Sequence, residues 1–269
     1  MSNLVKTTTV QKQKQMLPIV FMLLAAGGLT SLLWLQPRWL WTQLSPWLCP
    51  GATFFVETEA PMVALTVDDG PDDTDTHNAN TTRQILQVLK KYDAHATFFL
   101  IGGRITAKNQ SLIAEMVEQG NEVGNHLWAD EPSISLPLST FESELLETQR
   151  SILEAAQTRD KPVRINWLRP GSGMANRDMM KVARKYGYRV ALGSIWPYDT
   201  LIPSSRFAST QILGNVRPGA IVILHDRGDN GEWGKRTVKT LEQVLPELQR
   251  RGLKVVTLSK LLEQKPSRS

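Results

Sequence analysis

Short apolar runs alternate with amphipathic stretches along most of the chain, from about residue 61 to residue 262. Several runs are rich in β-branched residues, as in MVALTV, which is typical of buried strands. Seven strands are expected, at residues 62–67, 96–100, 121–124, 163–168, 188–193, 220–224 and 253–258. The longer stretches between them carry apolar residues at helical spacing, as in Ile85, Leu86, Val88 and Leu89. This alternation predicts an α/β domain in which helices cover a parallel sheet.

The N-terminal region contains an apolar segment, Met16–Leu35, of 20 residues without a charge. At a rise of about 1.5 Å per residue, a helix of this length spans a hydrocarbon core of roughly 30 Å. Lys6, Lys12 and Lys14 precede the segment, and positive charges favour the cytoplasmic side of a membrane. We therefore expect one transmembrane helix, with residues 1–15 in the cytoplasm and the domain outside it. Tryptophans that favour a membrane interface gather near the end of the segment and beyond it, at Trp34, Trp39, Trp41 and Trp47.

A cleaved signal peptide is the alternative for this segment, and it would make the protein secreted. Such a peptide has a shorter apolar region that ends at a small-x-small site. Ala25, Ala26 and Gly27 offer such a site only in the middle of the run, so a retained anchor is favoured. The remaining boundaries put a proline-containing linker at 36–60, the domain at 61–262 and a tail at 263–269.

The composition allows a substantial core and excludes several classes of protein. Hydrophobic residues make up 41% of the chain, and the single cysteine, Cys49, rules out an internal disulfide framework and a cysteine-rich zinc module. Much of the formal net charge of +5 comes from the termini, where Lys265 and Arg268 add to the N-terminal lysines. The domain itself is close to neutral and has no basic stripe with interleaved aromatic residues, so we expect no nucleic-acid partner.

Polar side chains that can carry chemistry follow the expected strands. They are Asp68 and Asp69 after MVALTV, His126 after NEVG, Arg169 after INWL and His225 after AIVIL. A single residue of this kind is more often a turn or cap residue, and we expect the acids Asp72, Asp73 and Asp75 to lie in a solvated loop. Because the carboxyl ends of barrel strands meet at one face, the recurrence at several strand ends predicts a shared site.

The adjacent carboxylates Asp68 and Asp69 would repel each other unless a cation lies near them. A metal ion resolves this conflict if one acid binds it and the other is left to move protons. Asp69, His126 and Asp130 offer oxygen, nitrogen and oxygen donors and leave a position for water. Three protein ligands and a water are the pattern of a catalytic zinc site. This set therefore predicts a divalent metal centre at the shared site.

Four ordered motifs make the chain resemble the polysaccharide deacetylases with a NodB homology domain, carbohydrate esterase family 4. TVDDGP is similar to the family's Thr-Phe-Asp-Asp-Gly-Pro, with Val67 in place of Phe. GNHLWAD resembles its His-x3-His motif, LRPGSG its Arg-Pro-Pro-Tyr-Gly motif, and ILHD its Leu-x-Leu-His motif. The similarity covers about residues 61–262. It implies a distorted (β/α)7 barrel, which agrees with the seven expected strands.

The resemblance also implies roles in proton transfer. Asp68 would be the general base, and Arg169 would hold it in place. His225 would be the general acid, and Asp199 in WPYDT would orient it. The sequence around Asp199 meets the family's Asp-x-x-Asp-Trp pattern only loosely, so the residues that flank Asp199 differ from those in the family motif.

Further positions concern the metal and the substrate. By the resemblance Asp69 and His126 would bind the metal, and the backbone N–H of Ser172 would help to stabilise an oxyanion. Asp130 stands where the family usually has its second metal-binding histidine, and its harder oxygen donor makes cobalt or manganese alternatives to zinc. Trp196 is a candidate sugar platform, with a position in the core as the alternative.

Together these expectations describe the metal-assisted hydrolysis of N-acetyl groups on an extracytoplasmic polysaccharide, such as a peptidoglycan- or chitin-like N-acetylglucosamine glycan, with release of acetate. One alternative is an esterase that removes O-acetyl groups from a polysaccharide. A second is a membrane-tethered glycan-binding module without catalysis, which Asp130 and the loosely met motif at Asp199 suggest. Glycosidase action is disfavoured. A glycosidase needs two carboxyl groups about 5 Å or more apart on either side of the glycosidic bond, and the adjacent residues Asp68 and Asp69 cannot easily take such positions.

Overall fold

The computed structural model describes residues 27–28, 30–32, 34–72, 80–156, 163–226 and 232–264. Its described residues contain one seven-stranded sheet in which neighbouring strands pair in parallel. The strands are β1 (Met62–Gly70), β2 (Ala96–Leu100), β3 (Glu122–Asn125), β4 (Trp167–Leu168), β5 (Arg189–Val190), β6 (Ile221–His225) and β7 (Lys254–Val256). Their order is β5-β4-β3-β2-β1-β6, and β7 pairs with the beginning of β1.

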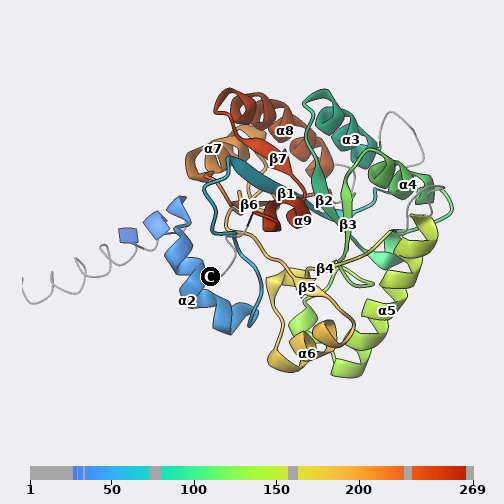
Figure 1. Cartoon of the computed structure of the whole chain (residues 1–269). Helices are drawn as coiled ribbons and strands as arrows, with labels where there is room; N and C mark the ends of the chain where they lie inside the picture. The colour runs from blue at the N-terminus through green and yellow to red at the C-terminus, as the bar shows by residue number, and fades with distance from the viewer. Residues whose placement is uncertain are drawn as a thin grey trace, which may run out of the picture.

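The sheet is a half-barrel in which β1 pairs with three strands, β2, β6 and β7. The chain that follows β5 returns toward β6, where Ile195 forms an isolated parallel bridge with Val222 and accepts a hydrogen bond from the Ile223 N–H at 2.9 Å. This arrangement is consistent with a distorted (β/α) barrel and confirms the α/β class that the sequence predicts (Figure 1). β4 and β5 have two residues each, so the ladder is shorter there than the apolar runs at 163–168 and 188–193 predict.

The helices are α2 (Arg38–Leu48), α3 (Thr81–Lys91), α4 (Gln110–Glu118), α5 (Leu138–Ala155), α6 (Arg177–Lys185), α7 (Ser205–Asn215), α8 (Glu232–Arg250) and α9 (Leu258–Leu262). Most helices lie around the outside of the sheet, whereas α9 lies near the middle of the view and packs against sheet residues such as Phe99 and Trp167 (Figure 1). Short 3-10 turns lie at Gly102–Arg104, Ser133–Ser135 and Gly171–Gly173. Side chains cap several N-termini: Asn80 accepts a hydrogen bond from the Arg83 N–H, and Ser204 accepts one from the Phe207 N–H.

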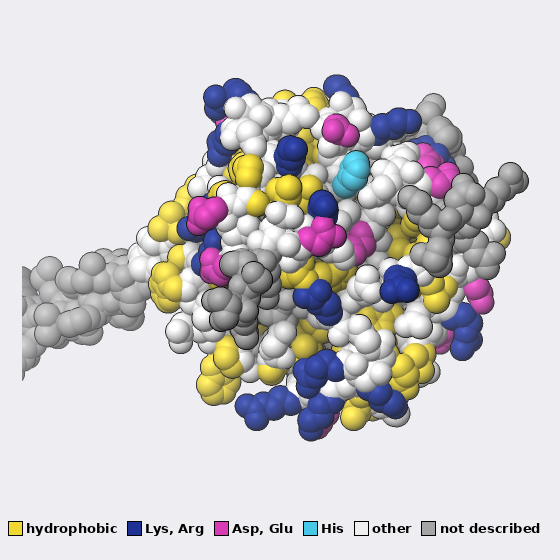
Figure 2. All heavy atoms as spheres, viewed as in Figure 1, with side chains coloured by type: hydrophobic (Ala, Val, Ile, Leu, Met, Phe, Trp, Pro, Cys, Tyr) yellow, Lys and Arg dark blue, Asp and Glu magenta, His cyan; other side chains and the backbone are white. Residues whose placement is uncertain are grey.

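Helix α2 lies within the stretch 36–60, where the sequence predicts a linker. Trp41 of this helix stacks on Phe54 with 5.7 Å between the ring centroids, and Cys49 is buried. Apolar contacts therefore attach this stretch to the domain, although its prolines are typical of a linker. Figure 2 shows hydrophobic side chains at the surface on the side of the molecule where α2 lies.

Most of the predicted anchor, residues 16–35, lies outside the described residues, as does the end of the predicted tail, residues 265–269. None of the helices in the described part of the chain has the length and apolar character needed to cross a bilayer. The transmembrane helix therefore stays a prediction from the sequence.

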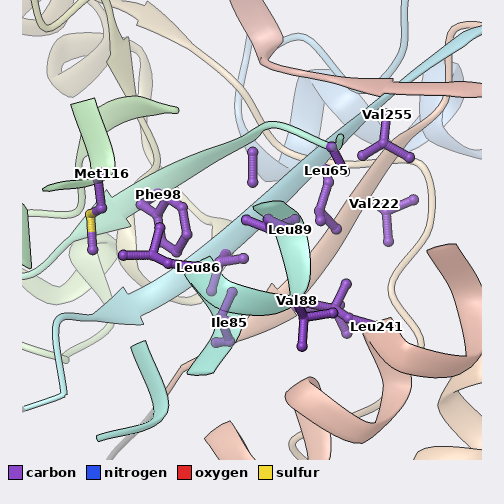
Figure 3. Packing of buried hydrophobic residues seen from close by; sticks show 14 of the residues in the cluster. Leu65, Ile85, Leu86, Val88, Leu89, Phe98, Met116, Val222, Leu241 and Val255 are labelled. Atoms are coloured by element: carbon purple, nitrogen blue, oxygen red, sulfur yellow. The ribbon is translucent and has the colours of Figure 1, made fainter. Parts of the chain in front are cut away.

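The core lies between the sheet and the helices α3 and α8. Leu65, Val222 and Val255 of the sheet pack with Leu89 of α3 and Leu241 of α8 (Figure 3). Each fully buried side chain of this size contributes about 1.5–3 kcal/mol relative to an exposed one. Because this packing fixes β1 and β6 side by side, it also fixes the polar residues at their carboxyl ends.

Candidate active site

The polar residues that follow the strands gather at the carboxyl ends of the sheet. Asp68 pairs in register with His225 across β1 and β6, and Asp69 is the next residue of β1. Asn125, the last residue of β3, pairs with Leu168 of β4, which places His126 beside Arg169. Residues from four strands therefore meet at one face, as the sequence predicts.

Asp68 and Arg169 form a buried ion pair. The Arg169 Nη1 lies 2.6 Å from the Asp68 Oδ1, and both side chains are buried. The same guanidinium donates to the Thr66 hydroxyl and to the backbone carbonyls of Ala191 and Leu192, at distances of 2.8–3.1 Å. Burial lowers the pKa of Arg169, and the charge of Asp68 opposes that shift. Because the guanidinium is held at four points, it fixes the Asp68 carboxylate in one orientation.

Asp69 and His126 form a second buried pair, with 3.3 Å between the Asp69 Oδ1 and the His126 Nε2. The other ring nitrogen, Nδ1, lies 2.6 Å from the Arg169 carbonyl oxygen, which can only accept a hydrogen bond. Nδ1 therefore carries a proton, which leaves Nε2, the atom that faces Asp69, to bind either a second proton or a metal ion. A backbone partner of this kind is typical of metal-binding histidines.

The charges around this pair support the ionised form of Asp69. Burial would raise the pKa of Asp69, but the hydrogen bond and the charge of His126 outweigh burial and lower that pKa to about 2. Burial would also lower the pKa of His126, yet the hydrogen bond with Asp69 and the charge of Asp68 raise it. Asp69 has a left-handed φ of 69°, a strained conformation that is found often at functional sites.

The spacing of the two donor atoms fits a divalent metal ion. Two donors on one tetrahedral zinc lie roughly 3.3–3.6 Å apart when each bond is about 2.0–2.2 Å. The 3.3 Å between Asp69 Oδ1 and His126 Nε2 is close to this spacing. Asp69 and His126 thus have the donor spacing of two metal ligands.

Asp130 does not join them: within the described ranges no group of three His, Cys, Asp or Glu side chains is close enough to hold a metal ion. Its Oδ2 lies 4.0 Å from the Arg104 Nη2, and the residue is exposed. The spacing of four residues would put His126 and Asp130 on one face of a helix, but the segment between them is irregular and Leu127 has a left-handed φ of 63°.

His225 and Asp199 form a third pair. The His225 Nδ1 lies 3.1 Å from both carboxylate oxygens of Asp199, and the backbone N–H of His225 donates to Oδ2 at 2.9 Å. Burial would lower the pKa of His225, but the hydrogen bond and the charge of Asp199, with the charges of Asp68 and Asp69, raise it to about 9. The imidazole is therefore protonated at neutral pH.

The two predicted substrate residues lie in loops after strands. Ser172 is exposed and has a left-handed φ of 57° in the 3-10 turn that follows β4. Trp196 is half-buried, and its ring lies 4.7 Å from the ring of Tyr198. Trp196 is thus neither fully in the core nor fully exposed. The roles proposed for these two residues stay predictions.

One buried cluster beside the site is absent from the sequence interpretation. Asp226, the residue after His225, is buried, and both of its oxygens contact threonine hydroxyls at the start of α3, Thr81 and Thr82. Asp72 is also buried and accepts hydrogen bonds from the backbone N–H and the hydroxyl of Thr81. The prediction that Asp72 lies in a solvated loop is therefore wrong, whereas Asp73 and Asp75 lie outside the described residues. The pair Thr81-Thr82 at a helix start is the sequence signal that could have suggested the contact.

Comparisons with known proteins show similarity to polysaccharide deacetylases. The sequence profile described as polysaccharide deacetylase matches residues 55–191. The chain is 35% identical over 217 residues to the peptidoglycan-N-acetylglucosamine deacetylase of Bacillus cereus, covering 79% of this chain and 93% of that protein.

Two solved structures are also similar. A family 4 acetyl xylan esterase from Clostridium thermocellum, in complex with a cobalt ion, matches with a TM-score of 0.65 and 28% identity over 76% of this chain and 93% of that chain. A family 4 pseudoenzyme from Bacillus anthracis matches with a TM-score of 0.68 and 25% identity over 81% of this chain and 71% of that chain.

Proposed function

The chain belongs to the polysaccharide deacetylase family, and from this premise we propose that it hydrolyses the carbon–nitrogen bond of N-acetyl groups on an extracytoplasmic glycan. The substrate class is a peptidoglycan- or chitin-like polymer of N-acetylglucosamine, and the products are acetate and a glucosamine unit. One observation carries the proposal. Asp68 and His225 lie in register on neighbouring strands, and each has its own buried partner, Arg169 and Asp199.

Asp68 acts as the general base. Its carboxylate is held by Arg169 and takes a proton from the attacking water. It is better suited to this task than Asp69, because the Asp69 oxygen faces the imidazole of His126. The backbone N–H of Ser172 is the proposed donor to the developing oxyanion.

His225 acts as the general acid. A pKa of about 9 keeps its ring protonated at neutral pH, which is the form that a general acid needs. Asp199 holds Nδ1, which leaves Nε2 to give its proton to the leaving nitrogen of the sugar. This proton makes the amine a leaving group.

A divalent metal ion would be held by Asp69 and His126, with Asp130 as the proposed third ligand in place of a histidine. Zinc is the first candidate and cobalt or manganese are the alternatives. The cobalt ion bound to the Clostridium relative supports a metal of this class. When bound, such an ion polarises a carbonyl group and lowers the pKa of a water ligand.

We further propose that the apolar segment Met16–Leu35 anchors the protein and that the catalytic domain lies outside the cytoplasm. Large apolar side chains exposed at the end of the segment and just beyond it support this location, because tryptophan favours the membrane interface. They are Trp34, Leu35, Trp39, Leu44 and Trp47, of which Trp47 is 87% exposed. Secretion after cleavage is the alternative.

Two other functions have a specific observation in their favour. The similarity to an acetyl xylan esterase supports the removal of O-acetyl groups as a second activity of the same site. The similarity to a pseudoenzyme, together with the position of Asp130 outside the Asp69–His126 pair, supports a glycan-binding module without catalysis. Release of acetate by the full chain, compared between N-acetylated chitooligosaccharides or peptidoglycan and O-acetylated xylan, separates the three. We expect release from the N-acetylated glycans; release from xylan alone or from neither substrate would favour the second or the third function.

A further inference from the structure

Gln36 is a buried polar residue that lies before α2, ahead of residues 55–191, which match the family profile. Only 3% of its surface is exposed. Its Nε2 donates to the Trp196 carbonyl at 2.6 Å, and its Oε1 accepts from the Trp196 N–H at 2.8 Å. The amide thus pairs with both backbone groups of a residue 160 positions later, as a neighbouring strand would.

The backbone of Gln36 is shaped for this contact. Its φ is 41°, in the left-handed region that a residue other than glycine rarely adopts. Such strain persists only where surrounding contacts stabilise it. The two hydrogen bonds to Trp196 are contacts of this kind, so the contact is a specific feature of the fold.

A second contact from the same segment reaches the same loop. The Trp41 Nε1 of α2 donates to the Ser194 carbonyl at 3.0 Å. The phenol of Tyr198 also has a hydrogen bond with Gln36, which opposes the rise that burial causes in the pKa of Tyr198. Residues 194, 196 and 198 are therefore all held from the N-terminal segment.

The loop needs this support, because its own structure is irregular. Its link to the sheet includes the isolated bridge between Ile195 and Val222. Tyr198 has a left-handed φ of 57°, and the next residue is Asp199, whose carboxylate contacts the ring and the backbone N–H of His225. A shift of the loop would move this carboxylate away from the imidazole.

We propose that Gln36 is a positioning residue for the reaction: it holds the loop 194–199 so that Asp199 meets His225. The segment before the domain is then part of the catalytic unit, and it links the loop that orients His225 to the chain that leads to the apolar segment. The inference rests on the proposed function only in taking His225 as the general acid.

The test compares Gln36→Ala with Gln43→Ala in the full chain in detergent micelles. Gln43 lies on α2 and is exposed, so its substitution makes the same change in the same segment. We expect Gln36→Ala to lower kcat by about tenfold to a hundredfold, the range for a small misplacement of a catalytic group. The alkaline loss of activity should also move to lower pH, because His225 loses part of the charge of Asp199 that keeps it protonated. Gln43→Ala should match the unsubstituted protein.

A second readout does not depend on activity. The chain has four histidines, so spectra of protein with isotope-labelled histidine are simple enough to follow the pKa of His225 directly. We expect this pKa to be lower in Gln36→Ala. If the protein releases no acetate from any glycan, the proposed function fails, and this titration still tests the role of Gln36.

Several outcomes would overturn the inference. An unchanged His225 pKa and pH profile would do so, even with a lower melting temperature, because Gln36 would then only stabilise the fold. A higher KM with unchanged kcat would mean that Gln36 positions Trp196 for substrate binding and not Asp199 for proton transfer. If Gln36→Ala does not fold, Trp41→Phe is the variant to test. It retains a ring that can stack on Phe54 and removes the N–H that donates to the Ser194 carbonyl. This variant should also lower the pKa of His225, but by less than Gln36→Ala. No shift in Trp41→Phe would then contradict the inference.

Discussion

The ring of His225 lies against the carboxylate of Asp199, with Nδ1 3.1 Å from both oxygens and the His225 backbone N–H on Oδ2. One carboxylate therefore fixes the backbone, the orientation and the charge of the imidazole. The residue immediately before His225 in the strand is Leu224, which is buried, so the ring extends from a rigid position.

The first prediction concerns the charge of Asp199. Asp199→Asn keeps an acceptor for the His225 N–H but removes the negative charge that raises the pKa of His225 to about 9. Activity that needs the protonated imidazole should then be lost at lower pH than in the unsubstituted protein, and kcat at neutral pH should fall by about tenfold or more. The pH profile of kcat measures this. Asp178→Asn, at an exposed aspartate of α6, is the control; equal profiles for both variants would remove Asp199 from the account.

The second prediction concerns Asp130 as a metal ligand. Asp130→Ala should weaken metal binding by an order of magnitude or more, because the ion would lose one of three protein ligands. Asp130→His should retain the metal and bind zinc more tightly relative to manganese or cobalt. Competition with a chromophoric chelator measures both. Glu131→Ala, at the neighbouring exposed carboxylate, is the control.

Unchanged affinity in Asp130→Ala would show that Asp130 is a loop carboxylate beside Arg104, as its 4.0 Å separation from the guanidinium already permits. The ion would then have only Asp69 and His126 as ligands among the three residues proposed here.

The third prediction concerns the buried acid Asp226. The Thr81 hydroxyl contacts Asp226 Oδ1 at 2.5 Å and Asp72 Oδ2 at 3.0 Å, but it has one hydrogen and can donate to only one of them. The second contact requires a proton on a carboxyl group. Burial, helped by the charges of Asp72 and Asp69, raises the pKa of Asp226 to about 7, which identifies Asp226 as the group that carries this proton.

For an acid, a pKa that is higher in the folded state means that stability falls as the pH rises from the unfolded value toward the folded one. Asp226 therefore costs stability between about pH 4 and pH 7, and the cost is fully present above pH 7. Asp226→Asn mimics the protonated acid, with an oxygen for the hydroxyl of Thr82 and an N–H for Thr81. We expect this variant to melt at least about 2 °C higher at pH 8 and to lose its advantage toward pH 4. A constant difference at every pH would contradict the protonation assigned to Asp226.

The fourth prediction concerns topology. Three lysines before the apolar segment and tryptophans after it predict that the domain lies outside the cytoplasm. A C-terminal alkaline phosphatase fusion should be active, whereas a fusion to a reporter that works only in the cytoplasm should not. The reverse pattern would overturn the orientation, and a mature protein that starts after Ala26 would replace the anchor by secretion.

The parts of the fold that follow from local pattern agree best with the sequence. β2 has the predicted bounds, and β1 and β6 begin within one residue of them, because continuous buried apolar runs are typical of strands in a parallel sheet. Helix α7 was not predicted; it buries few large apolar side chains, and its clearest local signal is the N-cap Ser204. Helix α5 begins at Leu138 after Pro137 and has no side-chain cap.

In the site, too, some contacts follow from the sequence pattern and others do not. Strand ends predict that Asp68, Arg169 and His225 meet, because parallel strands deliver their ends to one face. The contact of Gln36 with Trp196 spans 160 positions and leaves no periodic signal, so only the tertiary structure reveals it. Asp130 failed to join the metal pair in this structure because sequence spacing predicts proximity only in a regular element, and the segment after His126 is irregular.

The two adjacent acids, Asp68 and Asp69, have different proposed roles, one as the general base and the other as a metal ligand. Asp68 is held by Arg169 and Asp69 faces His126, so the same substitution at each should have different effects. Asp68→Asn should lower acetate release by about 10²–10⁴-fold, the usual contribution of a general base. It should leave the metal bound, whereas Asp69→Asn should lose the metal as well as activity.

The most direct measurement is therefore bound metal and acetate release in parallel, on the full chain in micelles, for the unsubstituted protein, Asp68→Asn and Asp69→Asn with N-acetylated chitooligosaccharide. The account predicts release and metal in the first, metal without release in the second, and neither in the third. Equal loss of metal in the two variants, or release that survives in Asp68→Asn, would contradict it.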